Sequence, residues 1–167
     1  PYSPGSWGHV GSDYYPRPDN SGLIRDEFGQ LYVGDGQYLH RCRAFGDSFG
    51  YRFDLPNDDY IVSLRFADAF RTSGERWFDV ALEGQIVLDD FDVAAMAGGT
   101  GIAVEREFMV TVVDGQLAID FIGGLSGPTD DNAIVEAISV VSADGAPVFE
   151  PTLQPTIDPT AQAGMRT

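Results

Sequence analysis

Aromatic side chains and planar polar groups lie in segments of this sequence that we predict to be loops. Flat apolar rings can cover the C–H face of a sugar, while carboxylate, amide and guanidinium groups hydrogen-bond its hydroxyls. If the fold brings these loops together, the residues form a candidate carbohydrate-binding site. The aromatic candidates are Tyr14, Tyr15, Phe45 and Phe70, and the polar candidates are Arg71, Asp130, Asp131 and Asn132.

Each candidate also has a purely structural interpretation. Phe45 and Phe70 could pack at the rim of the core, and Tyr14 and Tyr15 could be buried beneath the N-terminal segment. Asp131 could form a turn ahead of a strand, because Asp side chains hydrogen-bond to nearby backbone groups. The residue types alone leave both interpretations open.

Catalysis has little support in the sequence. Glycosidases use two carboxylates about 5–9 Å apart, and Glu105 and Glu107 project from one face of a predicted strand. That face is the predicted solvent face, where no desolvation would raise a carboxyl pKa. His9 and His40 have no Ser or Cys partner in a recognisable motif. We therefore expect no enzymatic activity.

A metal site and a reactive cysteine are the other chemistries considered. Asp89, Asp90 and Asp92 cluster in a way that suits calcium, but no EF-hand spacing is present. We interpret this run as an acidic turn and expect no cofactor, with a structural calcium ion as the alternative. Cys42 has no second cysteine to pair with, and we interpret it as a small buried hydrophobic residue.

Composition excludes several classes of protein. The chain has 167 residues, 43% apolar and 12% aromatic, enough for one domain with a buried core. Acidic residues number 26 against 10 basic ones, all Arg, and the net charge is −16. Nucleic acids and anionic membranes are disfavoured as partners, because binding to both depends on Lys and Arg. No apolar run is long enough to predict membrane insertion.

Three regions differ in composition. Residues 1–36 are rich in Gly, Pro, Asp and Tyr, and we predict a loop-rich segment with room for one short strand, packing on the rest. Residues 37–142 carry the short apolar runs of the predicted core. Residues 143–167, with Pro at every fourth position from 147 to 159, are predicted to be an extended tail or linker. Because the sequence begins at Pro1, we expect a processed product or a piece of a longer chain.

Apolar residues of the middle region alternate with polar ones at a period of two. This places one set of side chains on a buried strand face and the other outward. Strands at roughly ten-residue spacing, without a long helix, predict an antiparallel β-sandwich or barrel. Asp114-Gly115 suits a type I′ hairpin turn, and Glu83-Gly84 is a weaker turn signal. The predicted buried sets are Tyr60, Val62, Leu64 and Phe66; Phe78, Val80 and Leu82; Phe108, Val110 and Val112; and Leu117, Ile119 and Phe121.

A series of short motifs resembles the malectin-like carbohydrate-binding domains. Their order and spacing match over about residues 38–140, well over half the chain, and the ordered set is more specific than any single piece. The motifs are SFGY at 48–51, LP at 55–56, YIVSLRFAD at 60–68, RWFDV at 76–80, Gly84, VLDDFD at 87–92, AGG at 97–99, DGQLAIDF at 114–121 and NAIVEAI at 132–138.

The resemblance implies a non-catalytic, galactose-binding-like (jelly-roll) β-sandwich. It implies binding of glucose-containing oligosaccharides in a cleft of loops at one end, and such sandwiches often hold a structural calcium. By position, Tyr14 corresponds to one binding aromatic residue and Phe45 lies near a second. Phe70 corresponds to the first of an adjacent aromatic pair, and Asp131 to the binding aspartate.

Two features depart from the family pattern. Arg71 stands where the second aromatic residue of the pair is expected. The family's opening strand, an Asn-Ala-Gly-Gly-like segment, is missing before Tyr14, which would leave one edge of a sheet vacant.

A structural function is therefore the alternative to glycan binding. Segments such as 146–149 or 151–154 could add a strand to the vacant edge of a neighbouring molecule. A head-to-tail contact of this kind does not close and generates fibres. The two hypotheses are a secreted or cell-surface carbohydrate-binding module, and a subunit of an extracellular filament or surface layer that self-associates through residues 143–167.

Overall fold

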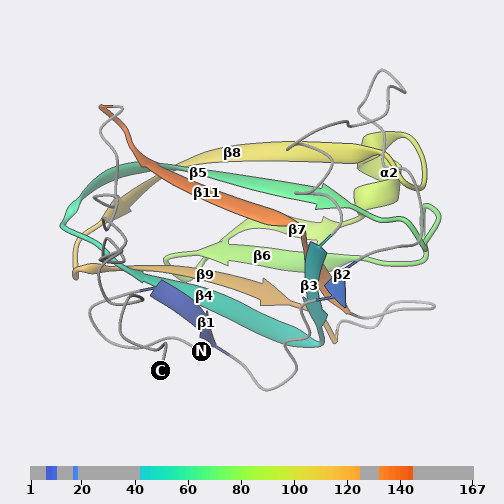
Figure 1. The fold of residues 1–167 in the computed structure, drawn as a ribbon, viewed down its shortest axis with the longest axis horizontal. Helices are drawn as coiled ribbons and strands as arrows, with labels where there is room; N and C mark the ends of the chain where they lie inside the picture. Colours follow the sequence, from blue (N-terminus) through green and yellow to red (C-terminus); the bar gives the residue numbers. More distant parts are fainter. Residues whose placement is uncertain (1–6, 11–16, 19–41, 125–131, 145–167) are drawn as a thin grey trace, which may run out of the picture.

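The computed structural model describes residues 7–10, 17–18, 42–124 and 132–144, and every structural statement below concerns these residues. Their strands pair antiparallel throughout, and the helix among them is the short α2 (Val93–Ala97). The predicted all-β antiparallel fold class is therefore confirmed (Figure 1).

A five-stranded sheet forms one layer of the molecule. Its strand order is β1-β4-β9-β6-β7, and each strand is antiparallel to its neighbours. The five strands are β1 (Trp7–Val10), β4 (Ser48–Asp54), β9 (Gln116–Ile122), β6 (Phe78–Leu82) and β7 (Gln85–Phe91).

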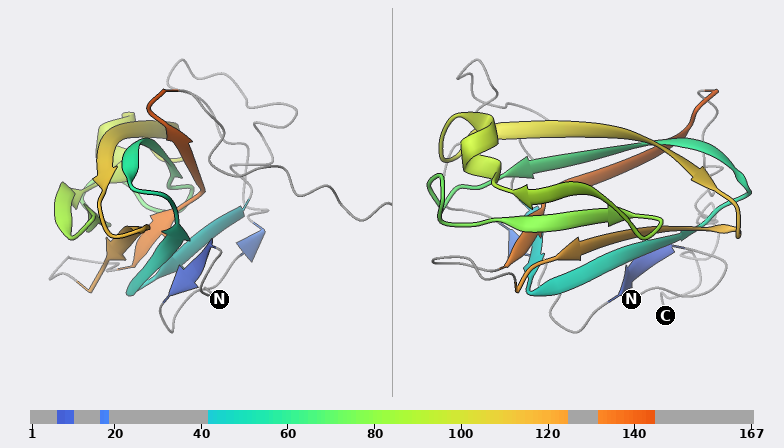
Figure 2. Two further views of the ribbon diagram at one scale, coloured as in Figure 1. Left: turned by 90° about the vertical axis from the view of Figure 1, so that its left-hand side faces the viewer. Right: turned by 180° about the vertical axis from the view of Figure 1, so that it is seen from behind.

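A three-stranded sheet of order β11-β5-β8 faces the first one, as the two views of Figure 2 show. A second three-stranded sheet, β10-β3-β2, lies at the same end of the sandwich as α2. The strands of the facing sheet are β11 (Ala137–Ser142), β5 (Asp58–Ala67) and β8 (Ala103–Val112). Those of the end sheet are β10 (Ala133–Val135), β3 (Cys42–Gly46) and β2 (Arg17–Pro18).

The core lies between the two facing layers and contains all four predicted sets of apolar residues. Within these sets only Phe108 is partly rather than fully buried, and it packs against the others. Phe66 is surrounded by aromatic rings, with centroids 6.0 Å from Phe78, 5.0 Å from Phe91 and 6.5 Å from Phe121. Burying a ring of this size contributes about 1.5–3 kcal/mol to folding. The predicted buried faces of these strands are therefore confirmed.

Of the two predicted turns, the structure confirms one and contradicts the other. Asp114 and Gly115 lie between β8 and β9, but these strands belong to different sheets, so the predicted hairpin is wrong. Glu83 and Gly84 join β6 to β7, which do pair, and their φ angles are 50° and 73°. Positive φ at both central positions is what a type I′ turn requires. A turn dipeptide shows that the chain reverses, but not which sheet the next strand enters.

The predicted absence of an opening strand is also wrong. β1 precedes Tyr14 and pairs with β4, with Trp7 opposite Phe53 and Val10 opposite Gly50. The sheet edge that we expected to be vacant is thus occupied by the chain itself. The sequence WGHV lacks the expected family motif, so only its pairing reveals the strand. A second short strand, β2, also lies in the described part of the N-terminal region.

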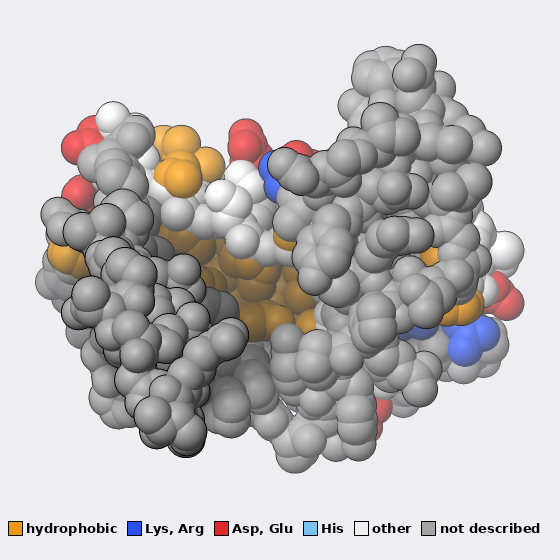
Figure 3. All heavy atoms as spheres, viewed as in Figure 1, with side chains coloured by type: hydrophobic (Ala, Val, Ile, Leu, Met, Phe, Trp, Pro, Cys, Tyr) orange, Lys and Arg blue, Asp and Glu red, His pale blue; other side chains and the backbone are white. Residues whose placement is uncertain are grey.

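Apolar side chains gather in a surface hollow on one side of the sandwich. In the view of Figure 1, apolar side chains are visible in a hollow between β11 and the pair formed by β4 and β9 (Figure 3). β11 and β1 are the edge strands of their sheets. The two layers are therefore not joined by a described strand along this side.

Candidate functional site

Loops at one end of the sandwich bring the described candidate residues together. Residues 68–77 connect β5 to β6 and include Phe70 and Arg71. Asn132 directly precedes β10, the strand that pairs with β3 at this end. We call residues 68–77 together with Asn132 the recognition end.

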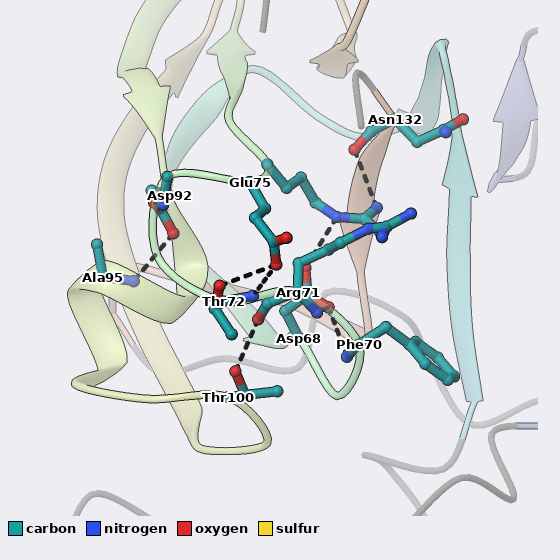
Figure 4. A network of polar contacts seen from close by, with 11 residues as sticks. Asp68, Phe70, Arg71, Thr72, Glu75, Asp92, Ala95, Thr100 and Asn132 are labelled. Carbon is teal, nitrogen blue, oxygen red and sulfur yellow. Dashed lines mark hydrogen bonds and ion pairs between the residues drawn. The ribbon is translucent and has the colours of Figure 1, made fainter. Parts of the chain in front are cut away.

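Asp68 organises the first part of the recognition end. Its side chain is buried although it carries a charge. Its Oδ1 accepts hydrogen bonds from the backbone N–H groups of Phe70 and Arg71, both at 3.0 Å (Figure 4). Asp often closes turns in this way, because its short carboxylate reaches the amides two and three residues further on. The backbone of both candidate residues is therefore fixed directly after β5.

Arg76 pairs with Asp68 and connects it to the second segment of the site. Arg76 Nε lies 2.8 Å from Asp68 Oδ2, and the two side chains are 7% and 1% exposed. Arg76 Nη1 donates a hydrogen bond of 3.1 Å to the backbone oxygen of Asn132. A charge buried to this degree requires a partner, because its lost hydration must be replaced. The guanidinium thus joins residues 68–77 to the residue before β10.

Further hydrogen bonds order the outer part of the loop. Glu75 Oε2 accepts from the backbone N–H of Thr72 at 2.7 Å and from its hydroxyl at 2.9 Å. Both bonds favour the charged form of the Glu75 carboxyl and therefore lower its pKa, and the backbone bond has the larger effect. Thr100 Oγ1, from the loop after α2, donates a hydrogen bond of 2.9 Å to the backbone oxygen of Arg71. The backbone of Arg71 is thus bonded through both its N–H and its carbonyl.

Three of the predicted site residues have described side chains, and all three lie at the recognition end. Phe70 is 56% exposed, while Arg71 and Asn132 are half-buried. In Figure 4 the three side chains extend in the same direction, away from Ala95 of α2. A ring, a guanidinium and an amide that extend in one direction offer a ligand both an apolar face and hydrogen-bonding groups.

The remaining predicted site residues are described in part or not at all. The backbone of Phe45 lies in β3, opposite Ile134 of β10, and Ile134 is two residues after Asn132. The side chain of Phe45 is outside the described part of the structure. Outside the described residues altogether are Tyr14, Tyr15, Asp130 and Asp131.

Asp68 and Arg76 belong to motifs in the sequence, but their contribution to the site is not evident from it. A usable signal exists for Asp68, since an Asp directly after an alternating strand commonly closes a turn. Arg76 has no comparable local signal. Its partner Asn132 is 56 positions away, so only the tertiary structure reveals the contact.

The acidic run that suggested calcium has structural contacts. Asp92 is the N-cap of α2, and its Oδ1 accepts from the N–H of Ala95 at 2.9 Å. The carboxylates of Asp79, Asp89 and Asp90 lie within 4.8 Å of one another. Asp79 Oδ1 also accepts from the N–H of Asp90 at 2.8 Å. Oxygen ligands of this type suit calcium, but exposed acidic groups are common without an ion, so a structural calcium ion stays the alternative to the expected absence of a cofactor.

The carboxylates considered for catalysis are exposed, as expected for the outer face of β8. Glu105 forms an ion pair of 3.2 Å with Arg65, and Glu107 Oε1 accepts from the hydroxyl of Ser63 at 3.0 Å. Both contacts connect β8 to β5 on this face. The carboxylates therefore have polar contacts on the outer face of the sheet.

These features define a class of protein: a two-layered β-sandwich with an aromatic and polar loop site at one end. The sequence profile of the Malectin domain matches residues 9–138. The chain belongs to the malectin domain family. Membership supports a carbohydrate-binding or extracellular sensing role.

Sequence relatives include much longer proteins. Receptor-like protein 4 of Arabidopsis thaliana is 33% identical over 135 residues, which is 77% of this chain and 21% of that protein. A probable LRR receptor-like serine/threonine-protein kinase of the same plant is 32% identical over 131 residues, 71% of this chain and 13% of the kinase. Human Malectin is 26% identical over 136 residues, 70% of this chain and 44% of Malectin. The chain therefore spans less than half of each of these relatives.

Solved structures contain the same fold. Bacteroides uniformis beta-glucuronidase matches with a TM-score of 0.64 and 22% identity, over 85% of this chain and 15% of that one. The ANXUR1 extracellular domain from Arabidopsis thaliana matches with a TM-score of 0.65 and 10% identity, over 78% and 39% of the two chains. At such identities the likeness shows the fold alone.

Proposed function

We propose that this chain is a non-catalytic carbohydrate-binding module that recognises glucose-containing oligosaccharides or glycans through its recognition end. The observation that carries the proposal is the exposed ring of Phe70, on a loop fixed by buried bonds, at the same end of the sandwich as Arg71 and Asn132. The proposed contacts are Tyr14, Phe45, Phe70, Arg71, Asp131 and Asn132.

The contrast between two neighbouring phenylalanines supports this assignment. Phe66, at the end of β5, is fully buried, whereas Phe70 in the following loop is largely exposed. The backbone N–H of Phe70 is nevertheless bonded to Asp68, so the ring is displayed from an ordered loop. An aromatic group presented in this way loses little conformational entropy on binding, which favours affinity for the apolar face of a sugar.

We further propose that the module is placed outside the cell or at its surface. The support is its similarity to receptor-like proteins, of which it spans only a part. No helix among the described residues is long and apolar enough to cross a membrane. The proposed organisation is a loop-rich segment at 1–36 packing on the module at 37–142, followed by a tail or linker at 143–167.

The alternative, a filament or surface-layer subunit, has less support. It relied on a vacant strand position at the sheet edge, and β1 occupies that position. Self-association through residues 143–167 concerns a segment that lies outside the described residues from position 145 onward, and it stays a prediction.

Calorimetric titration with maltose, nigerose, isomaltose and cellobiose tests the proposed function. We expect saturable binding of at least one of these disaccharides, and loss of affinity on replacing Phe70. Met109→Ala is the matched control, because Met109 is 73% exposed on β8 outside the recognition end and should leave binding unchanged. Absence of binding by the unmodified protein to all four sugars would contradict the proposal.

A further inference from the structure

We propose that Asp68 and Arg76 act together as positioning residues, which align the two chain segments of the glycan site. The segments are the loop that carries Phe70 and the start of β10. This inference rests on the proposed glycan binding and adds which buried residues set its affinity. With side chains 1% and 7% exposed, neither residue is expected to touch the sugar.

The burial of this ion pair sets it apart. Two other ion pairs among the described residues, Arg52–Asp120 and Arg65–Glu105, have side chains that are 22–42% exposed. Replacing a buried ion pair with apolar residues of similar volume often leaves stability unchanged or raises it. Stability alone is therefore a weak reason for a charged pair at this position, and the orientation of its surroundings is a stronger one.

One ion pair and three hydrogen bonds of these two residues link the two segments. Asp68 Oδ1 accepts hydrogen bonds from the backbone N–H groups of Phe70 and Arg71, and Oδ2 forms the ion pair with Arg76. Arg76 Nε forms this ion pair with Asp68, and Nη1 donates a hydrogen bond to the backbone oxygen of Asn132. Since the guanidinium is planar and rigid, the spacing between its two nitrogens is fixed. These two side chains thus link the loop to Asn132 across a fixed spacing.

The substitution Arg76→Lys separates positioning from charge neutralisation. Lysine keeps the positive charge opposite Asp68, but it ends in a single nitrogen and cannot reproduce the fork of Nε and Nη1. We therefore expect this variant to fold, to keep its ion pair, and to bind the sugar less tightly.

The decisive experiment compares Arg76→Lys with Leu117→Ala. Leu117 is fully buried near the start of β9, which follows β8 after a short turn. This turn lies at the end of the β5–β8 pair marked by Val112, whereas the recognition end lies at the other end, marked by Ala67. Both variants are titrated with the disaccharide that the unmodified protein binds, at a temperature where both are folded. We expect the Kd to rise about tenfold in Arg76→Lys, as misplaced contact groups do at other sites, and to stay unchanged in Leu117→Ala.

Each outcome is informative. Unchanged affinity in Arg76→Lys, or equal losses in both variants, would overturn the positioning role while leaving glycan binding intact. Failure of the unmodified protein to bind any tested sugar would overturn the proposed function, and this inference with it. If Arg76→Lys does not fold, Asp68→Asn replaces it, because the amide oxygen can still accept from both N–H groups. That variant should also bind about tenfold more weakly, and unchanged binding would overturn the proposal.

Discussion

The core and the recognition end of this sandwich are stabilised by different forces. The core is apolar surface contributed by both layers, centred on rings such as Phe66 and Phe121. The recognition end is ordered by a buried ion pair, Asp68–Arg76, and by directional hydrogen bonds to backbone groups.

The difference has consequences for sequence change. Apolar packing is non-directional and tolerates exchanges that conserve volume. A chain of directional bonds depends on one geometry, so a single substitution can alter all of it. We infer that the core determines whether the chain folds, whereas the buried polar pair determines where a few surface side chains point.

The largest expected effect is on the core. Phe121→Ala or Phe78→Ala should lower the free energy of unfolding by about 3–5 kcal/mol, through lost burial and the cavity that remains. Both side chains are fully buried. Denaturant unfolding measures the change, with Met109→Ala as the exposed control. A Phe121→Ala variant as stable as its parent would show that the ring does not face the core.

The next largest effect concerns the recognition end. Phe70→Ala should weaken glycan binding by about 1–3 kcal/mol, as aromatic anchors do at other interfaces. Its free energy of unfolding should change by less than about 0.5 kcal/mol, because the side chain is largely exposed. Calorimetry and denaturant unfolding on one sample provide both values. A large loss of stability with unchanged affinity would instead mean that Phe70 is a packing residue.

A smaller effect is expected in the β6–β7 turn, which belongs to neither region. Gly84 has a φ of 73°, and a Cβ added there would meet no atom within 4 Å. Gly84→Ala should therefore lower the free energy of unfolding by about 1 kcal/mol through backbone conformation alone. Sugar affinity should be unchanged, because β6 runs from the recognition end to this turn. A loss of affinity in this variant would contradict the proposal that the β6–β7 turn and the recognition end are independent.

The smallest effect is a pH dependence within the recognition end. Hydrogen bonds from Thr72 lower the pKa of Glu75 below its usual 4.5 in the folded protein. The stabilisation is therefore present above the unfolded pKa and is lost as the pH falls through the folded pKa. In a plot of the free energy of unfolding against pH, Glu75→Gln should remove this part of the fall at acid pH, which we call the acid limb. If the acid limb has the same slope in both proteins, the Thr72–Glu75 contact does not contribute.

Much of the core could be predicted from the sequence, because alternation at a period of two reports directly which face of a strand is buried. Leu117, Ile119 and Phe121 illustrate this, since all three are fully buried. Sheet membership could not be predicted in the same way. Asp114-Gly115 reverses the chain between sheets rather than within one, and β1 pairs through its backbone without a distinctive motif.

The candidate site was predictable only in its local parts. Phe70 and Arg71 follow a recognisable strand, so their place in a loop is a property of nearby sequence. The contact between Arg76 and Asn132 joins residues from distant parts of the chain, and no local pattern reports it. Asp68 would have been assigned to a turn, whereas its buried charge becomes apparent only with its partner in place.

The most direct test of glycan binding at the recognition end is an NMR titration of the full chain with maltose, nigerose, isomaltose and cellobiose. We predict that one of these sugars shifts the amide signals of Phe70, Arg71 and Asn132 in a saturable manner. The amides of Gly84 and Leu117, remote from this end, should keep their positions. Shifts that cluster away from residues 68–77 and Asn132, or no shifts with any of the four sugars, would contradict the proposed site.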